Sequence, residues 1–244
     1  MEHREYKRIV PNAKEAIVFI HGIVGTPNHF QNFLPLVPPH ISVHNLLLDG
    51  HGKGVVDFSG TSMKKWEAQV EQAVNDLAES HERVYLVAHS MGTLLALDQV
   101  AKNRNIAGLF LLAVPVKLFI KPKMVSNVCK VFFDRISPDD KDAIASRDAY
   151  GIGPDKNILH YIGWIPRYLE LFAKIRKTRR ILAAIDKPCR IFQSRWDEMV
   201  SIGSLKYLKQ IPTASVSLLE ASGHYYYEEK DLHWLMEAFS DFLI

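Results

Sequence analysis

The sequence has only two cysteines, no long apolar run and no strong excess of charge of either sign. Cys129 and Cys189 stand far apart and belong to no metal-like cluster, which indicates reduced thiols and predicts no metal site. No apolar run approaches the roughly 18 residues that predict a membrane-spanning helix. The first residues also lack the apolar stretch of a secretory signal. We therefore expect a cytoplasmic protein without an integral membrane segment.

The chain otherwise has the composition of an ordinary globular protein. Its 244 residues are 48% hydrophobic and 23% charged, enough for one large domain or two modest ones. The net charge of +3 is too small to indicate a nucleic-acid partner, and no pattern indicates the oligomeric state. Residues 115–190, however, carry 16 Lys/Arg and 8 Asp/Glu, which leaves a balance of −5 for the rest of the chain. This basic stretch is a candidate inserted domain.

Short apolar runs alternate with amphipathic stretches along most of the chain. The runs predict six strands, many of them apolar on both faces, at 15–22, 41–49, 83–90, 107–115, 189–197 and 215–224. Helical spacing of apolar residues predicts helices over 63–77 and 232–242. This alternation predicts an α/β fold with a doubly wound, mostly parallel sheet.

The alternation stops between residues 115 and 187, a stretch too long for a plain connection. We expect a helical cap over 115–187, inserted into an α/β sheet core formed by 1–114 and 188–244. Within it, one face of a predicted helix carries Trp164, Tyr168, Phe172 and Ile175. This face should be buried, above a crevice at the carboxyl ends of the strands.

The same helix carries a basic run from Lys174 to Arg180. We expect this run on the solvated opposite face, with recruitment of anionic substrates or an anionic lipid surface as the alternative.

The segment "VAHSMGTLLAL", residues 87–97, joins a predicted strand to a predicted helix through Ser90. A nucleophile on such a sharp turn needs small residues two positions before and after it, because the strand and helix backbones nearly touch. Ala88 and Gly92 meet this need, although Ala88 has one methyl more than the usual glycine. Ser90 is therefore the candidate nucleophile, and a small polar residue at a strand–helix junction is the alternative.

A serine hydroxyl needs a base to take its proton and a carboxylate to orient that base. His224 follows the last predicted strand, and Asp197 ends the strand before it, in the order that this topology requires. We expect Glu198 to point to the opposite side. Asp186 precedes the same strand and so lies at the wrong edge of the sheet.

An oxyanion hole needs backbone N–H groups aimed at the developing charge. Met91, directly after Ser90, supplies one at the start of the helix. The loop "HGIVGTPNHF", residues 21–30, leaves a strand through two glycines and can supply the N–H of Ile23. The alternative is a merely flexible strand–helix loop.

Taken in order, these motifs resemble those of the α/β-hydrolase superfamily, especially its small carboxylesterase and monoacylglycerol-lipase-like members. "HGIVGT", "LDGHGKG", "AHSMG", "WDEMV" and "SGH" resemble the oxyanion loop, the G-H-G loop, the elbow, the acid motif and the histidine motif of that superfamily. The resemblance covers about 15–114 and 189–244. The chain departs from the pattern at Ala88 and Thr93, where glycines are frequent, and the cap matches no family pattern.

The resemblance and the residues together imply a serine hydrolase that cleaves small-molecule carboxylic esters through an acyl-enzyme, without a cofactor. An aminopeptidase, a thioesterase or a lyase on the same scaffold are alternatives, although the basic cap disfavours recognition of a free amine. A non-catalytic binding homologue is another alternative. It is disfavoured because such proteins usually lose a member of the triad.

Overall fold

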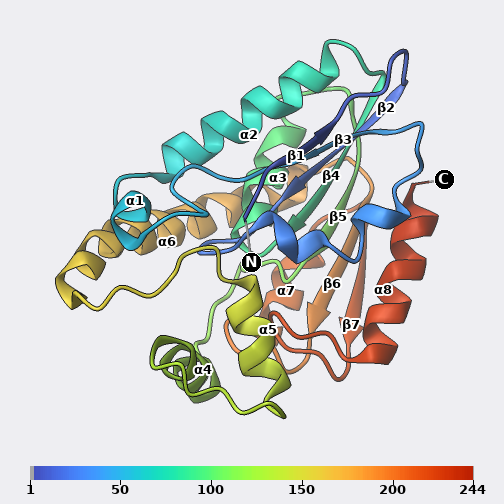
Figure 1. Ribbon diagram of the computed structural model, residues 1–244. Helices are drawn as coiled ribbons and strands as arrows, with labels where there is room; N and C mark the ends of the chain where they lie inside the picture. Colours follow the sequence, from blue (N-terminus) through green and yellow to red (C-terminus); the bar gives the residue numbers. More distant parts are fainter. Residues whose placement is uncertain (1–2, 244) are drawn as a thin grey trace.

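The computed structural model describes residues 3–243, and its centre is a seven-stranded sheet with the order β1-β3-β2-β4-β5-β6-β7 (Figure 1). The edge strand β1 runs antiparallel to β3, and every other pairing is parallel. The predicted α/β fold with a doubly wound, mostly parallel sheet is thus confirmed. The strands are β1 (Tyr6–Arg8), β2 (Glu15–Ile20), β3 (Ser42–Asn45), β4 (Arg83–His89), β5 (Ile106–Leu112), β6 (Cys189–Ser194) and β7 (Ala214–Leu219).

Helices connect the strands and cover both faces of the sheet. The α-helices are α1 (Val55–Ser59), α2 (Met63–Ala78), α3 (Met91–Val100), α4 (Pro122–Phe132), α5 (Lys141–Ala149), α6 (Trp164–Ile181), α7 (Leu205–Leu208) and α8 (Glu229–Phe242). Short 3-10 helices are η1 (Pro27–Phe30), η2 (Leu34–Leu36), η3 (Ile158–Gly163), η4 (Leu182–Ala184) and η5 (Ile202–Ser204).

Each of the six predicted strands is present, with bounds that differ by a few residues from the apolar runs. The runs are buried on both faces because helices pack on both sides of the central strands. The sequence pattern does not predict β1. Two of its three residues, Lys7 and Arg8, are charged and the strand is largely exposed, so pairing with β3 at the edge of the sheet forms it without a buried apolar face.

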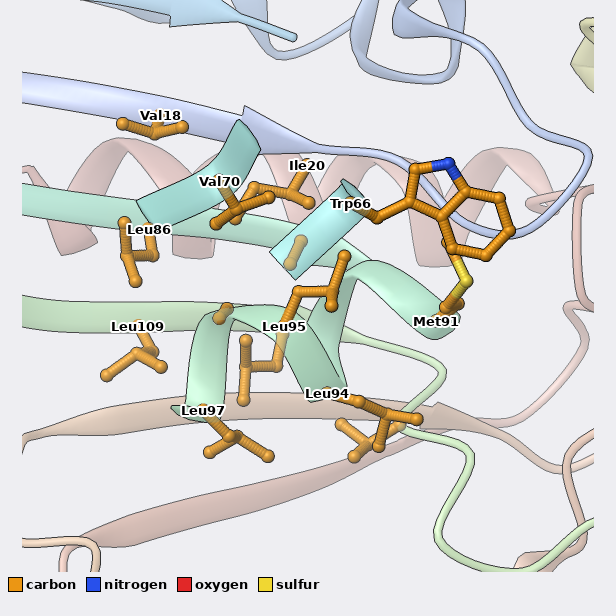
Figure 2. Close-up of a cluster of buried hydrophobic side chains, with 14 of the residues drawn as sticks. Val18, Ile20, Trp66, Val70, Leu86, Met91, Leu94, Leu95, Leu97 and Leu109 are labelled. Atoms are coloured by element: carbon orange, nitrogen blue, oxygen red, sulfur yellow. The ribbon is translucent and has the colours of Figure 1, made fainter. Parts of the chain in front are cut away.

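Two apolar cores lie on opposite faces of the sheet. On one face, α2, α3 and the middle of α6 pack against β2, β4 and β5; Figure 2 shows Trp66 and Leu95 among the buried side chains of this core. On the other face, α8 and η1 contribute Phe239 and Phe30 to a second core. The result is a three-layer α/β/α arrangement.

The order of the strands places one crevice at a defined position. The chain runs outward from β2 to β3, returns to β4 on the other side of β2, and then continues outward through β5, β6 and β7. The loops after β2 and β4 therefore diverge at the point where the direction of winding reverses. Ligands in open α/β sheets bind at such a point, beside the carboxyl ends of the strands.

The segment between β5 and β6 forms α4, α5, η3 and α6. The prediction that Phe172 is buried on the inner face of the cap helix is wrong. Phe172 is 45% exposed, whereas Leu171 and Ile175 are buried. The expectation of a solvated Lys174 is also wrong. Its ammonium is buried between the carboxylates of Glu67 on α2 and Asp98 on α3, which draw the second half of α6 onto the core. The division into a core and an inserted cap over 115–187 stays a prediction.

Candidate active site

Ser90 occupies a strained turn between β4 and α3. Its φ of 52° and ψ of −125° lie outside the regions that non-glycine residues favour. The turn is held from both sides: the N–H of Ser90 donates to the carbonyl of Leu112 at 2.9 Å, and its own carbonyl accepts from the N–H of Thr93 at 2.9 Å. Strain of this kind is maintained at a serine elbow, where it presents the hydroxyl at the end of the strand.

The close approach that the flanking small residues predict is present on the side of Gly92. A Cβ atom at Gly92 would lie 2.1 Å from the carbonyl oxygen of Ile20 and 2.7 Å from that of His21. Ala88, on the other side of the elbow, is fully buried in the core beside β2, so its extra methyl is accommodated. The departure from glycine at this position therefore leaves the turn intact.

His224 and Asp197 are paired in a buried site at the end of β6 and β7. Nδ1 of His224 lies 2.8 Å from Oδ2 of Asp197, and each residue is 1% exposed. The other oxygen of Asp197 accepts hydrogen bonds from the N–H groups of Met199 and Val200, at 2.8 and 2.7 Å. Because both of these N–H groups donate to the carboxylate, Asp197 acts as an acceptor and Nδ1 of His224 donates to it. Nε2 has no hydrogen-bond partner among residues 3–243.

A second histidine connects the elbow to the His224 loop. Nε2 of His89, the residue before Ser90, donates to the carbonyl of His224 at 3.0 Å, and the two rings lie 4.7 Å apart. Burial first, and the neighbouring histidines second, hold the pKa of His89 well below its usual range, so its ring stays neutral. The structure thus gives His89 a positioning role.

The loop after β2 brings Ile23 to the same edge of the sheet. His21 fixes the start of this loop, since its Nδ1 donates to the carbonyl of Gly22 and its Nε2 accepts the N–H of Leu48, at 2.9 and 3.1 Å. Val24 has a φ of 59°, which is rare for a β-branched residue and turns the loop sharply.

The N–H of Ile23 and that of Met91, the first residue of α3, donate to no acceptor within residues 3–243. These are the two donors that the sequence predicts for an oxyanion hole.

Glu198 is a residue that the sequence interpretation placed wrongly. It does not point away from the site: it is 4% exposed, and its Oε2 accepts the N–H of His224 at 2.7 Å. Its other carboxylate oxygen lies 3.7 Å from the ammonium of Lys123, on α4. Burial, and then the charge of Asp197, raise the pKa of Glu198, while the His224 N–H acts against them. Adjacent carboxylates therefore hold the ring and the backbone of one histidine.

Gly151 is a residue that the sequence interpretation missed. Its N–H donates to the carbonyl of Val24 at 2.8 Å, and its carbonyl accepts the N–H of Gly52 at 2.7 Å. A Cβ atom at Gly151 would lie 2.3 Å from the carbonyl oxygen of Gly25. The segment between β5 and β6 is thus attached directly to the loop that carries Ile23. The signal in the sequence was the glycine-rich string "YGIGP".

An apolar cavity of about 140 Å³ adjoins these residues. Ile23 and Tyr225, the neighbour of His224, line one side, and side chains of α4 and α6, including Val128 and Trp164, line the other. None of its lining residues is charged, and burial raises the pKa of the Tyr168 hydroxyl to about 12, so that hydroxyl stays neutral. Among residues 3–243, no cluster of three His, Cys, Asp or Glu is arranged to hold a metal ion.

Comparison with known proteins identifies the family of this chain. The sequence model of the alpha/beta hydrolase family matches residues 17–238. This chain belongs to that family. A search of curated proteins finds no match.

Similar solved structures include one described with the metagenome-derived lipolytic enzymes LipS and LipT, at 18% identity and a TM-score of 0.72, covering 97% of this chain and 99% of that one. The monoacylglycerol lipase of Paleococcus ferrophilus has 16% identity and a TM-score of 0.69, covering 100% and 98%. Est1E of Butyrivibrio proteoclasticus, solved with ferulic acid, has 19% identity and a TM-score of 0.65, covering 98% and 93%. At these identities the likeness shows the fold. The protein is therefore a member of a hydrolase family with the fold of that family. Esterases and lipases are among the solved structures that resemble it.

Proposed function

We propose that this hydrolase-family protein cleaves small-molecule carboxylic esters, with Ser90 as nucleophile, His224 as general base and Asp197 as the orienting acid. The observation that carries the proposal is the His224–Asp197 pair, in which Nδ1 is held at 2.8 Å and Nε2 is left without a partner among residues 3–243. That pair lies beside a strained serine elbow, to which the His89 contact joins it.

In this mechanism Ser90 Oγ attacks the ester carbonyl while Nε2 of His224 takes the hydroxyl proton. The N–H groups of Ile23 and Met91 donate to the oxyanion that forms. The imidazolium, stabilised by Asp197, then gives its proton to the leaving alcohol as the C–O bond breaks. A water molecule, deprotonated in turn by His224, attacks the acyl-enzyme. The bond between the acyl carbon and Ser90 Oγ then breaks as the imidazolium returns the proton to Oγ, which releases the carboxylic acid and restores Ser90.

The cavity favours a neutral, apolar acyl group. Its lining is uncharged, and at about 140 Å³ it is small. Burying an apolar chain there is favourable by roughly 0.8 kcal/mol for each methylene. We therefore expect kcat/KM to rise with the length of the acyl chain until the cavity is filled, and to fall beyond that length.

The test is hydrolysis of 4-nitrophenyl esters of graded acyl length, with thioester and anilide analogues alongside, and covalent labelling with a fluorophosphonate. We expect one adduct by intact-protein mass spectrometry, mapping to Ser90, and no adduct with Ser90→Ala. The matched control is Ser59→Ala, which replaces a partly buried serine of α1, outside the elbow. Turnover of esters with labelling elsewhere, or no turnover by a folded protein, would overturn the assignment.

A further inference from the structure

Large apolar side chains are exposed mainly on the segment between β5 and β6. Of the seventeen large apolar side chains that are exposed among residues 3–243, eleven lie between positions 119 and 172. That stretch is 54 of the 244 residues, so the exposed groups are concentrated there about threefold. Scattered apolar residues on a surface are normal, whereas a concentration of them marks an interaction site.

Helix α6 carries the most regular part of this surface. Ile165, Leu169 and Phe172 follow one another at spacings of four and three, and they are 57, 60 and 45% exposed. These spacings place them on one face of the helix. Arg176 and Arg180, both exposed, continue the same face by one turn each. We call these five residues the α6 outer face. At the N-terminal end of α6, the preceding η3 adds the exposed side chains of Ile158, Leu159 and Ile162.

The fold does not need this second apolar face. The inner face of α6 already packs on the molecule: Leu171 and Ile175 are buried, and the indole N–H of Trp164 donates to the carbonyl of Val55 at 3.1 Å. A helix that only connects β5 to β6 would be polar on its outer side. The outer apolar side chains therefore need a separate explanation.

The helix that carries the α6 outer face also bounds the cavity. Trp164 and Tyr168, on the inner face of the same helix, line the cavity. Across it, Val128 on α4 both lines the cavity and is 43% exposed, and Val125 beside it is 56% exposed. Apolar surface thus lies on both helices that bound the cavity.

The charge of this region is positive. Residues 155–180 contain seven Lys/Arg and two Asp/Glu. Both acidic residues are paired within the protein, Asp155 with His160 and Glu170 with Arg167. By contrast, Arg176 and Arg180 pair with no acidic side chain in the part of the chain that the structure describes, so their charge faces solvent.

We propose that the α6 outer face binds the surface of an anionic lipid bilayer, with its apolar side chains in the interface and its arginines on the lipid phosphates. Apolar groups beside exposed cations are the combination that interfacial helices use. A second copy of the chain fits less well, because a twofold interface would set the same excess of positive charge against itself.

The test measures binding and does not depend on the proposed hydrolysis. The full chain is sedimented with vesicles of phosphatidylcholine alone and of phosphatidylcholine with phosphatidylserine, at low and high salt. The apolar variant is Leu169→Gln/Phe172→Gln, and the charge variant is Arg176→Gln/Arg180→Gln. The matched control is Ile9→Gln/Trp234→Gln, which removes two apolar side chains of similar exposure, 52 and 41%, outside this region. Circular dichroism verifies folding, and light scattering gives the mass without vesicles.

We expect the wild type and the control to bind the anionic vesicles alike. The apolar variant should bind them about tenfold more weakly or worse, because two large side chains no longer enter the interface. The charge variant should lose roughly fivefold for each arginine on anionic vesicles only, and with it most of the salt dependence. The proposal is overturned if the wild type does not bind anionic vesicles, or if a folded apolar variant binds as well as the control. It is also overturned if the apolar substitutions change only the mass that light scattering gives without vesicles, because the face would then mediate self-association.

Discussion

The close contact between α3 and β2 makes Gly92→Ala a severe change. The new Cβ atom would lie 2.1 Å from the carbonyl oxygen of Ile20, and real Cβ atoms essentially never approach closer than 3.0 Å. The helix must therefore move from the strand by nearly 1 Å. Ile20 is fully buried, and β2 is paired on both sides by β3 and β4, so the strand itself cannot yield. Overpacking costs about 1–3 kcal/mol and more where backbone must shift, so we expect a loss of at least ~3 kcal/mol in the free energy of unfolding.

The same displacement should disable Ser90. The proposed nucleophile stands two residues before Gly92, at the start of the helix that must move. A misplacement of about 1 Å at a reacting group costs on the order of 100-fold in rate. We therefore expect a decrease of about that size in kcat for a short 4-nitrophenyl ester, with KM less affected.

The control for this prediction is Gly153→Ala, because a Cβ atom at Gly153 meets nothing within 4 Å. Urea unfolding gives the stability of both variants, and initial rates give kcat and KM. If Gly92→Ala matched Gly153→Ala within about 0.5 kcal/mol, and kept its kcat, the close-packed elbow would be refuted.

Further predictions concern the acids, the elbow, the cavity and pH. Asp197→Asn should keep the fold but lower kcat by about 10⁴-fold, since the imidazole loses its orienting partner. Glu198→Gln should lower kcat much less, because its amide oxygen still accepts the His224 N–H. If steady-state kinetics showed the reverse, the two acids would exchange roles. Ala88→Gly should stay active and Ala88→Val should be severely impaired, and an active, stable valine variant would contradict the crowding. Trp164→Ala should shift the preferred acyl length in the ester series, whereas Phe172→Ala, on the outer face, should not; equal shifts would show that the cavity is not the acyl site. Burial lowers the pKa of His51 from 6.5 to about 4. The neutral ring therefore stabilises the fold above pH 6.5, and this contribution is lost as the pH falls from 6.5 through about 4. At pH 5 the free energy of unfolding should be lower by about 2 kcal/mol for this reason. Urea unfolding at pH 7 and pH 5 should show a drop that is smaller in His51→Phe, and an equal drop in that variant would exclude His51 as its source.

Most of the fold was predictable because its signals are local. Apolar runs bounded by turn residues place six strands, since strands buried on both faces need apolar residues at every position. The edge strand β1 carries no such signal, because an exposed antiparallel edge tolerates polar residues and depends on its partner for pairing. The residues of the candidate site were predictable for a similar reason: a tight elbow demands small neighbours within two positions of Ser90, and parallel strands deliver their carboxyl ends to one edge.

The directions of individual side chains were not predictable. Glu198 was expected to point away from Asp197 by strand alternation, but β6 ends at Ser194, and beyond it the chain turns so that both carboxylates reach His224. The glycine-rich string "YGIGP" makes Gly151 noticeable, but it does not indicate that this residue docks on the loop of Ile23, because the contacts of Gly151 lie far away in the sequence.

By itself, the sequence determined the layered α/β fold and the choice of Ser90, Asp197 and His224 as candidate site residues, because periodicity and local steric demands are encoded within a few residues of each position. Only the tertiary structure decided which face of α6 is buried. Helical spacing alone allows Phe172 inside and Lys174 outside, yet Glu67 and Asp98, from two distant helices, stabilise the buried ammonium and turn Phe172 outward. A helix with apolar residues on two sides has no preferred orientation of its own, so the charges and surfaces packed against it select one.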